Sequence, residues 1–228
     1  MIYLLHGDYQ LASRNFLKNL TDQAKKNGVE RIWLDGTKLD QTDLIQNLTS
    51  NSLFGGEKLV IIENLFSRLK SAELERIFAW LKKYEADDGL IFWEKKPIGK
   101  ILQRNLPAKT QVKEFKTPVI IFKLVEQITP QTKSQALQTL ETALINEPAE
   151  FIFAMIVRQI RLLLLLAEGE KVSGAPWMLG KWQKQAQAFN KDELLTSYRK
   201  LYMIDKSIKT GQTIMPLAWH LAIWLAQL

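Results

Sequence analysis

The first half of the chain alternates short apolar runs with amphipathic stretches of helical period. Apolar or β-branched runs bounded by turn residues predict strands, and apolar residues spaced three and four positions apart predict helices. The expected strands are 2–5, 31–34, 58–62, 90–93 and 112–115, and the expected helices are 11–26, 41–48, 72–83 and 98–105. This alternation is typical of βαβ units, so it predicts a three-layer α/β domain with a parallel sheet.

The pattern changes after Thr117 and Pro118, because no further β-branched run bounded by turns follows. The expected helices of this half are 119–128, 133–145, 149–168, 177–189, 191–209 and 215–228. Their short connections indicate neighbouring, largely antiparallel helices in one bundle. We therefore predict two domains, an α/β domain over residues 1–117 and an all-α bundle over residues 118–228.

The composition is that of an ordinary globular protein, with 228 residues, 46% hydrophobic and 24% charged. It contains no cysteine and two histidines, which excludes a disulfide scaffold and thiol chemistry and leaves little for zinc. The longest apolar stretch, 151–167, is interrupted by Arg158, Gln159 and Arg161, which indicates a bundle helix rather than a membrane span. The first residues lack a basic region, so we expect no signal peptide and a cytoplasmic protein.

Basic residues outnumber acidic ones by 31 to 24, which gives a net charge of +7. Such a balance is compatible with a polyanionic partner. One cationic run spans residues 95–116, and its candidate nucleic-acid contacts are Lys95, Lys96, Lys100, Arg104 and Lys109. The same run also fits a solvated basic face on a surface helix, and the sequence leaves both interpretations open.

The turn after the first expected strand lies where a P-loop would bind phosphates. Aligned on Gly7, the chain has Ala12 at the second glycine and Ser13 at the lysine of G-x-x-x-x-G-K-[ST]. The third strand ends in a single acid, Glu63, where an ATPase would place acids that hold Mg²⁺. Both halves of the site fail together, so we predict no functional ATP or magnesium site, no other metal site and no catalytic residue.

Two large apolar residues, Leu53 and Phe54, follow Ser52 and precede a glycine pair. Glycine adopts positive φ readily, so the pair could project both side chains from a loop or a helix end. Exposed, they would anchor in an apolar pocket of a partner. Packed inward, they would close a glycine helix cap, and the sequence alone leaves both readings open.

Taken together, these features resemble the delta subunit of the bacterial DNA polymerase III clamp loader. In the first half, residues 2–8 resemble its opening strand and turn, and residues 52–65 resemble its clamp-binding element and next strand. In the second half, residues 158–164 resemble its collar helix. The remaining matches are Gln185, Ala186, Phe189, Leu201, Asp205 and residues 208–211.

The resemblance implies an AAA+-like fold without a working P-loop, and a non-catalytic subunit that needs no cofactor. It implies binding of the DNA sliding clamp through a hydrophobic wedge, which helps to open or load the clamp during DNA replication. The wedge would be Leu53 and Phe54, with Ser52 at its flank. The helical half would bind other clamp-loader subunits, DNA is a further expected partner, and no membrane is involved.

One departure from the family lies at the junction of the two halves. The family places a small helical lid domain there, whereas residues 115–118 run directly into 119–125, which resemble the start of the collar. We therefore expect the lid to be absent, which leaves assembly into a five-subunit loader open. The alternative functions are a basic nucleic-acid-binding protein that uses residues 95–116, and a degenerate NTPase-fold scaffold.

Overall fold

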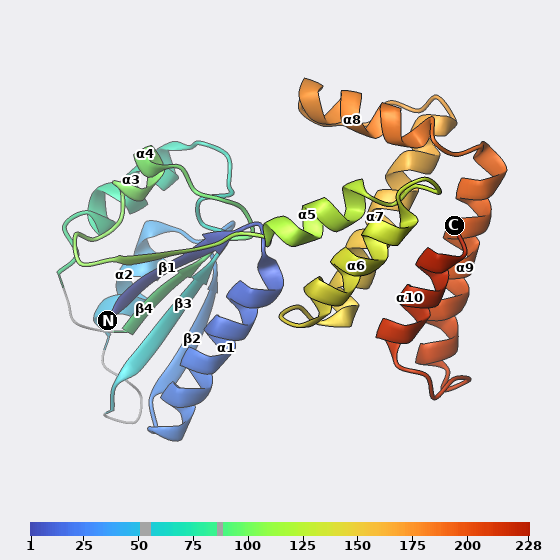
Figure 1. Cartoon of the computed structure of the whole chain (residues 1–228). Coiled ribbons are helices and arrows are strands. Elements are labelled where there is room, and N and C mark those ends of the chain that lie inside the picture. The colour runs from blue at the N-terminus through green and yellow to red at the C-terminus, as the bar shows by residue number, and fades with distance from the viewer. Residues whose placement is uncertain (51–55, 86–88) are drawn as a thin grey trace. The chain divides into compact units, whose positions relative to one another are not determined.

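The computed structural model describes residues 1–50, 56–85 and 89–228, and the chain divides into two compact units, Met1–Thr117 and Pro118–Leu228 (Figure 1). The first unit contains a five-stranded sheet built from β1 (Ile2–Gly7), β2 (Glu30–Asp35), β3 (Lys58–Glu63), β4 (Gly89–Trp93) and β5 (Gln111–Phe115). The strand order is β2-β3-β4-β1-β5 and every pair is parallel. The expected parallel α/β architecture is thus confirmed, and all five strands end at the same edge.

Helices cover both faces of the sheet. Successive strand residues face opposite sides, so each central strand contributes apolar side chains to both faces. Leu5 and Ile61 pack with Leu17 of α1 (Gln10–Lys26) on one face. Leu4 and Ile62 pack on the other face, against α2 (Gln41–Thr49) and α3 (Ala72–Leu81). Burial on both faces explains why the central strands are continuous apolar runs rather than alternating ones.

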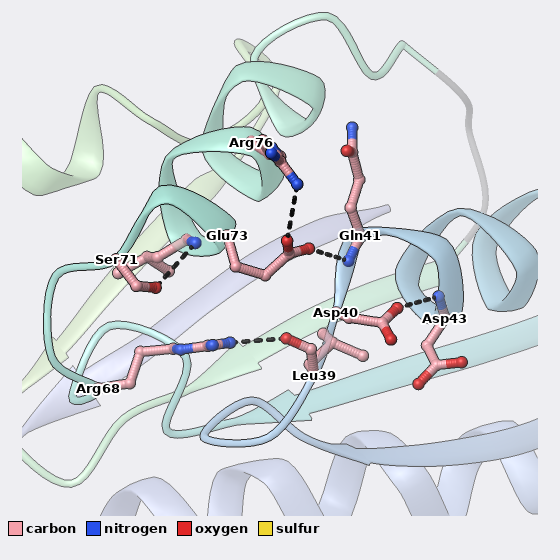
Figure 2. Close-up of polar contacts among 9 residues, drawn as sticks. Leu39, Asp40, Gln41, Asp43, Arg68, Ser71, Glu73 and Arg76 are labelled. Atoms are coloured by element: carbon pink, nitrogen blue, oxygen red, sulfur yellow. Dashed lines mark hydrogen bonds and ion pairs between the residues drawn. The ribbon is translucent and has the colours of Figure 1, made fainter.

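Side-chain caps begin both α2 and α3 (Figure 2). A carboxylate oxygen of Asp40 accepts a hydrogen bond from the backbone N–H of Asp43 at 2.7 Å. The hydroxyl of Ser71 accepts one from the N–H of Leu74 at 3.2 Å. Each cap satisfies an N–H group that has no partner inside the helix.

Two contacts then join the starts of these helices (Figure 2). Glu73 accepts a hydrogen bond from the N–H of Gln41 at 2.7 Å, and the Arg68 guanidinium donates to the carbonyl of Leu39 at 2.6 Å. The first turn of α2 is therefore fixed to α3. The other end of α2 leads into residues 51–55.

The fourth helix of the first unit is shorter than its pattern predicted. The expected helix over 98–105 is a single turn, α4 (Lys100–Gln103). Ile98 is buried in the core and donates its N–H to His6, and the backbone of Gly99 is extended. Gly99 is the N-cap, so the helix begins at Lys100.

The second unit is helical throughout, as the sequence predicted. Its helices are α5 (Val119–Glu126), α6 (Lys133–Leu144), α7 (Ala149–Ala167), α8 (Pro176–Ala186), α9 (Lys191–Lys209) and α10 (Leu217–Ala226). The last helix begins two residues later than expected, because Pro216 is its N-cap. Helix α7 packs against the other five, and α5 begins directly after residues 116–118, with no further helix between it and β5.

A buried glutamine joins three helices of this unit. The Nε2 of Gln185 on α8 donates to the carbonyls of Val125 at 2.7 Å and Ile128 at 3.1 Å, at the end of α5. Its Oε1 accepts a hydrogen bond from Gln159 of α7 at 2.6 Å. One side chain thus satisfies a carbonyl in the last turn of α5, a carbonyl just after that helix and one buried amide donor.

We expect Gln185→Leu to destabilise the helical unit by roughly 2–4 kcal/mol, because it leaves these buried groups without partners. The unfolding temperature, followed by circular dichroism at 222 nm, should fall by several degrees. Gln183→Leu, at an exposed position of the same helix, is the matched control and should change little. Equal unfolding temperatures for the two variants would contradict the role assigned to the network.

Candidate functional site

Three side chains meet where β1, β3 and β4 end, at the edge where open parallel sheets bind ligands. The connection after β1 crosses one face and that after β4 crosses the other, which defines a topological switch point. Arg14 of α1 binds both carboxylate oxygens of Glu63, with N–O distances of 2.5 and 2.7 Å. Its guanidinium carbon lies 3.4 Å from the centroid of the Trp93 ring. A bidentate ion pair stacked on an aromatic ring therefore lies at this point.

The residue at the P-loop lysine position supports the same ring. Ser13 is buried, and its Oγ accepts a hydrogen bond from Nε1 of Trp93 at 3.2 Å. The same hydroxyl donates to the carbonyl of Gln10 at 3.0 Å. The sequence identified Ser13 and Glu63 as degenerate positions but missed their links to Arg14 and Trp93.

The turn after β1 is held against the end of β5. Gly7 has φ of 139°, and a Cβ at this position would lie 1.9 Å from the carbonyl oxygen of Phe115. That same oxygen accepts the N–H of Tyr9 at 3.1 Å, and Asp8 accepts the N–H of Thr117 at 2.8 Å. In a P-loop such N–H groups point at phosphate, whereas here the N–H of Tyr9 bonds within the chain.

Two further titratable groups are buried next to this edge. Glu94 is fully buried and accepts hydrogen bonds from the N–H of Phe66 and the hydroxyl of Ser67, both at 2.7 Å. Burial raises the pKa of Glu94, and these two hydrogen bonds oppose the increase. His6 is 2% exposed and its Nδ1 accepts the N–H of Ile98 at 3.1 Å. Burial lowers the pKa of His6, which favours the neutral ring.

The raised pKa of Glu94 predicts a pH-dependent effect of Glu94→Gln. The stability that the protonated carboxyl contributes is fully present below the ordinary pKa of glutamate and is lost as the pH rises through the raised value. Glutamine keeps an acceptor for Phe66 and stays neutral. The advantage of the variant over the wild type in unfolding temperature should therefore grow as the pH rises from about 4, near the ordinary pKa of glutamate, to neutral pH.

Calorimetry across this range, with Glu75→Gln on the exposed surface of α3 as the control, measures the effect. The control removes the same charge from an exposed position and leaves the buried Glu94 unchanged. A difference between Glu94→Gln and wild type that stays constant with pH would contradict the assignment.

The proposed wedge residues Ser52, Leu53 and Phe54 lie outside the described residues. The described segments on either side are well anchored. Before them, α2 is buried through Leu44 and Leu48 and has Ser50 as its C-cap. After them, Lys58 of β3 is only 6% exposed, and its ammonium group donates to the carbonyl of Ser50. One lysine thus links the two ends of the segment that carries the pair.

The candidate nucleic-acid contacts are all exposed, but they do not share one helix face. Only Lys100 lies in α4, and Arg104 is its C-cap. Lys95 and Lys96 follow β4 at the carboxyl edge, whereas Lys109 precedes β5 at the opposite edge. The structure therefore distributes these cations over two edges of the sheet.

The charge of Lys95 acts on a neighbouring acid, Asp35. Hydrogen bonds from the hydroxyl and the N–H of Thr37 lower the pKa of Asp35, and the charges of Lys38 and Lys95 add to this effect. Asp35 ends β2, the edge strand farthest from β5. Lys95 thus belongs to the β2 side of the carboxyl edge, away from Lys109.

The described part of the chain lacks two features, a cluster of metal ligands and a helix that could span a membrane. Within 1–50, 56–85 and 89–228, no three histidine, aspartate or glutamate side chains group as metal ligands would. None of the helices in those ranges is long and apolar enough to span a membrane.

Comparison with known proteins gives a family match in the second unit and a structural likeness. Residues 119–224 match the sequence profile of the DNA polymerase III delta subunit, C-terminal domain. No curated protein matches this sequence. Among solved structures, the DNA clamp loader delta protein of Bacillus subtilis is similar, with a TM-score of 0.46 and 14% identity over 99% of this chain and 94% of that one.

Proposed function

We propose that this chain, whose helical unit is delta-subunit-like, is a non-catalytic subunit of a DNA polymerase III clamp loader. The observation that carries the proposal is the match of residues 119–224 to the C-terminal domain of the delta subunit, which spans nearly all of the second unit, Pro118–Leu228. In this role the chain acts in DNA replication in the cytoplasm. Its partners are the sliding clamp and the other loader subunits.

The carboxyl edge of the sheet supports a role without ATP turnover. Arg14 and Glu63 bind each other at this edge, and the N–H of Tyr9 bonds to Phe115. A bound nucleotide would need a cation for its phosphates and an acid for its magnesium ion. The groups of this chain that come nearest to those roles neutralise each other, so we propose that the unit is a scaffold without a nucleotide or a metal.

The clamp-binding element of the proposal is Leu53 and Phe54, with Ser52 at its flank. Two features support the choice. Large apolar residues beside glycines suit an anchor that enters a partner's pocket. In addition, α2 and the contact between Lys58 and Ser50 fix both ends of the segment to the sheet. Fixed ends reduce the conformational entropy that is lost on binding.

The test is association of the purified chain with the sliding clamp encoded by the same genome, followed by surface plasmon resonance. We expect saturable binding that does not change when ATP is added, and no ATP hydrolysis by the chain alone. Absence of clamp binding would refute the proposed function, and measurable ATP turnover would refute its non-catalytic part.

The same samples test the nucleic-acid alternative. A chain that binds DNA but not the clamp, with an affinity that falls steeply with salt, would favour it. In that case charge reversal at Lys95, Lys96, Lys100, Arg104 and Lys109 should abolish DNA binding. Under the proposed function, the same reversal should leave clamp binding intact.

A further inference from the structure

A groove in the second unit lies between α7 and α9, with a cavity volume of about 710 Å³. Its floor is largely apolar and includes Phe153, Val157 and the buried Leu201. Both helices are 19 residues long, which corresponds to about 28 Å of axis. The residues that line the groove span 153–161 of α7 and 198–205 of α9, about 12 Å of axis, so the groove can hold about two turns of a further helix.

The residues along its edges are unusual for this half of the chain. All three arginines of residues 118–228 line the groove, Arg158 and Arg161 from α7 and Arg199 from α9, while the other cations of this half are lysines. Both tyrosines of this half, Tyr198 and Tyr202, line it as well. Arginine and tyrosine are among the residues that most often dominate the energy of protein interfaces.

The three arginines are exposed, and among the described residues none of them makes an ion pair or a side-chain hydrogen bond. Lysines elsewhere in the unit do pair, as Lys181 does with Glu126 at 2.8 Å. A planar guanidinium binds carboxylates in a bidentate manner, which an ammonium group does not. The edges of the groove thus offer three unused sites for carboxylates.

We propose that this groove binds an acidic amphipathic α-helix of a partner protein. The apolar face of that helix would pack against Phe153, Val157 and the exposed Tyr202, and its carboxylates would pair with the arginines on the two edges. The surface deepens the proposed function and rests on it in part, because it gives the helical unit a defined subunit-binding site.

Single-stranded nucleic acid is a less suitable occupant, although arginine and tyrosine also serve such sites. The arginines flank an apolar floor from two sides and do not form a continuous track for phosphates. The carboxylate of Asp205, which pairs with Lys209 at 2.8 Å, also lines the groove and would repel a phosphodiester chain. Separate carboxylate side chains can avoid Asp205, whereas a polyanionic backbone passing along the groove cannot.

The experiment measures binding of three fluorescent probes to the full chain by anisotropy. The probes are an amphipathic peptide of about 20 residues with leucines on one face and glutamates on the other, the same peptide with lysines for glutamates, and an oligothymidylate of about 20 nucleotides. The acidic peptide should bind most tightly, and added salt should weaken it. In the triple variant Arg158→Gln/Arg161→Gln/Arg199→Gln, its affinity should fall about tenfold or more.

The matched control is Lys123→Gln/Lys171→Gln/Lys206→Gln, which removes the same charge from exposed positions outside the groove. It should bind the acidic peptide as the wild type does, and thermal unfolding checks that both triple variants are folded. No binding of the acidic peptide, equal losses in the two triple variants, or tighter binding of the oligothymidylate would each overturn the proposal. Clamp binding is measured separately, so failure here and failure of the proposed function remain distinct.

Discussion

Replacing Leu53 and Phe54 together with alanine should weaken binding of the sliding clamp by a factor of about a hundred or more. Burial of two large apolar side chains contributes roughly 3–5 kcal/mol in transfer free energy, and about 2.7 kcal/mol already corresponds to a hundredfold change. Surface plasmon resonance on immobilised clamp measures the change. The loss should lie mainly in the dissociation rate, as is usual for anchors that fill a pocket.

The control for this variant is a second pair of exposed apolar residues in the same unit. Leu69 is 90% exposed and Ile101 is 80% exposed, and Leu69→Ala/Ile101→Ala removes a similar apolar area from the surface. Clamp binding by this control should equal that of the wild type. If the double change at 53 and 54 left binding intact, the wedge would have to lie elsewhere in the chain.

Gly7→Ala should destabilise the first unit by at least about 3 kcal/mol, the largest effect on stability that we expect from one methyl group. The added Cβ would lie 1.9 Å from the carbonyl oxygen of Phe115, and backbone cannot move aside as a flexible side chain can. Relief of the clash would separate β1 from β5 and break the bond from Tyr9 to the same oxygen. Thermal unfolding should shift down by about 10 °C or more.

The variant Gly28→Ala separates the cost of the steric clash from the cost of the positive φ. Gly28 also has positive φ, 73°, but nothing lies within 4 Å of its added Cβ. It should cost only the backbone penalty of about 1–2 kcal/mol. If both variants lost the same free energy of unfolding, the close approach of the Phe115 carbonyl to Gly7 would not explain the effect of Gly7→Ala.

The sequence was sufficient to predict the architecture, because continuous apolar runs indicate buried strands and the spacing of apolar residues indicates helices. The run Leu59–Ile62 is apolar since both faces of β3 are covered, and the prolines at 118, 148 and 216 mark the starts of three helices. Helix α4 was overestimated, because its pattern does not reveal that Ile98 turns into the core before the helix starts.

The site was harder to predict, because its contacts depend on strand order. Arg14 and Glu63 are 49 residues apart, and they meet only because β3, β4 and β1 lie side by side. No periodicity specifies that order, and Trp93 alone would be assigned to the core. Gln185 has the same difficulty, since a glutamine among exposed polar residues gives no sign that it is buried.

The arginines of the helical unit show an intermediate case. Arg158 and Arg161 are three positions apart, so a helical reading already places them on one face. Arg199 lies on another helix, and only the packing of α7 against α9 brings it to the same groove. The signal that could have been used is compositional, because this half of the chain has arginine at these three positions and lysine at its other cationic ones.

The ion pair between Arg14 and Glu63 also has a thermodynamic consequence. A domain stabilised by a bound nucleotide gains stability according to how far the free concentration of that nucleotide exceeds its dissociation constant. Here both charged groups belong to one chain, so their pairing is unimolecular and dilution cannot reverse it. Under the proposed function, which includes no bound nucleotide, the free energy of unfolding of this unit should therefore not change with the ATP concentration in the cell.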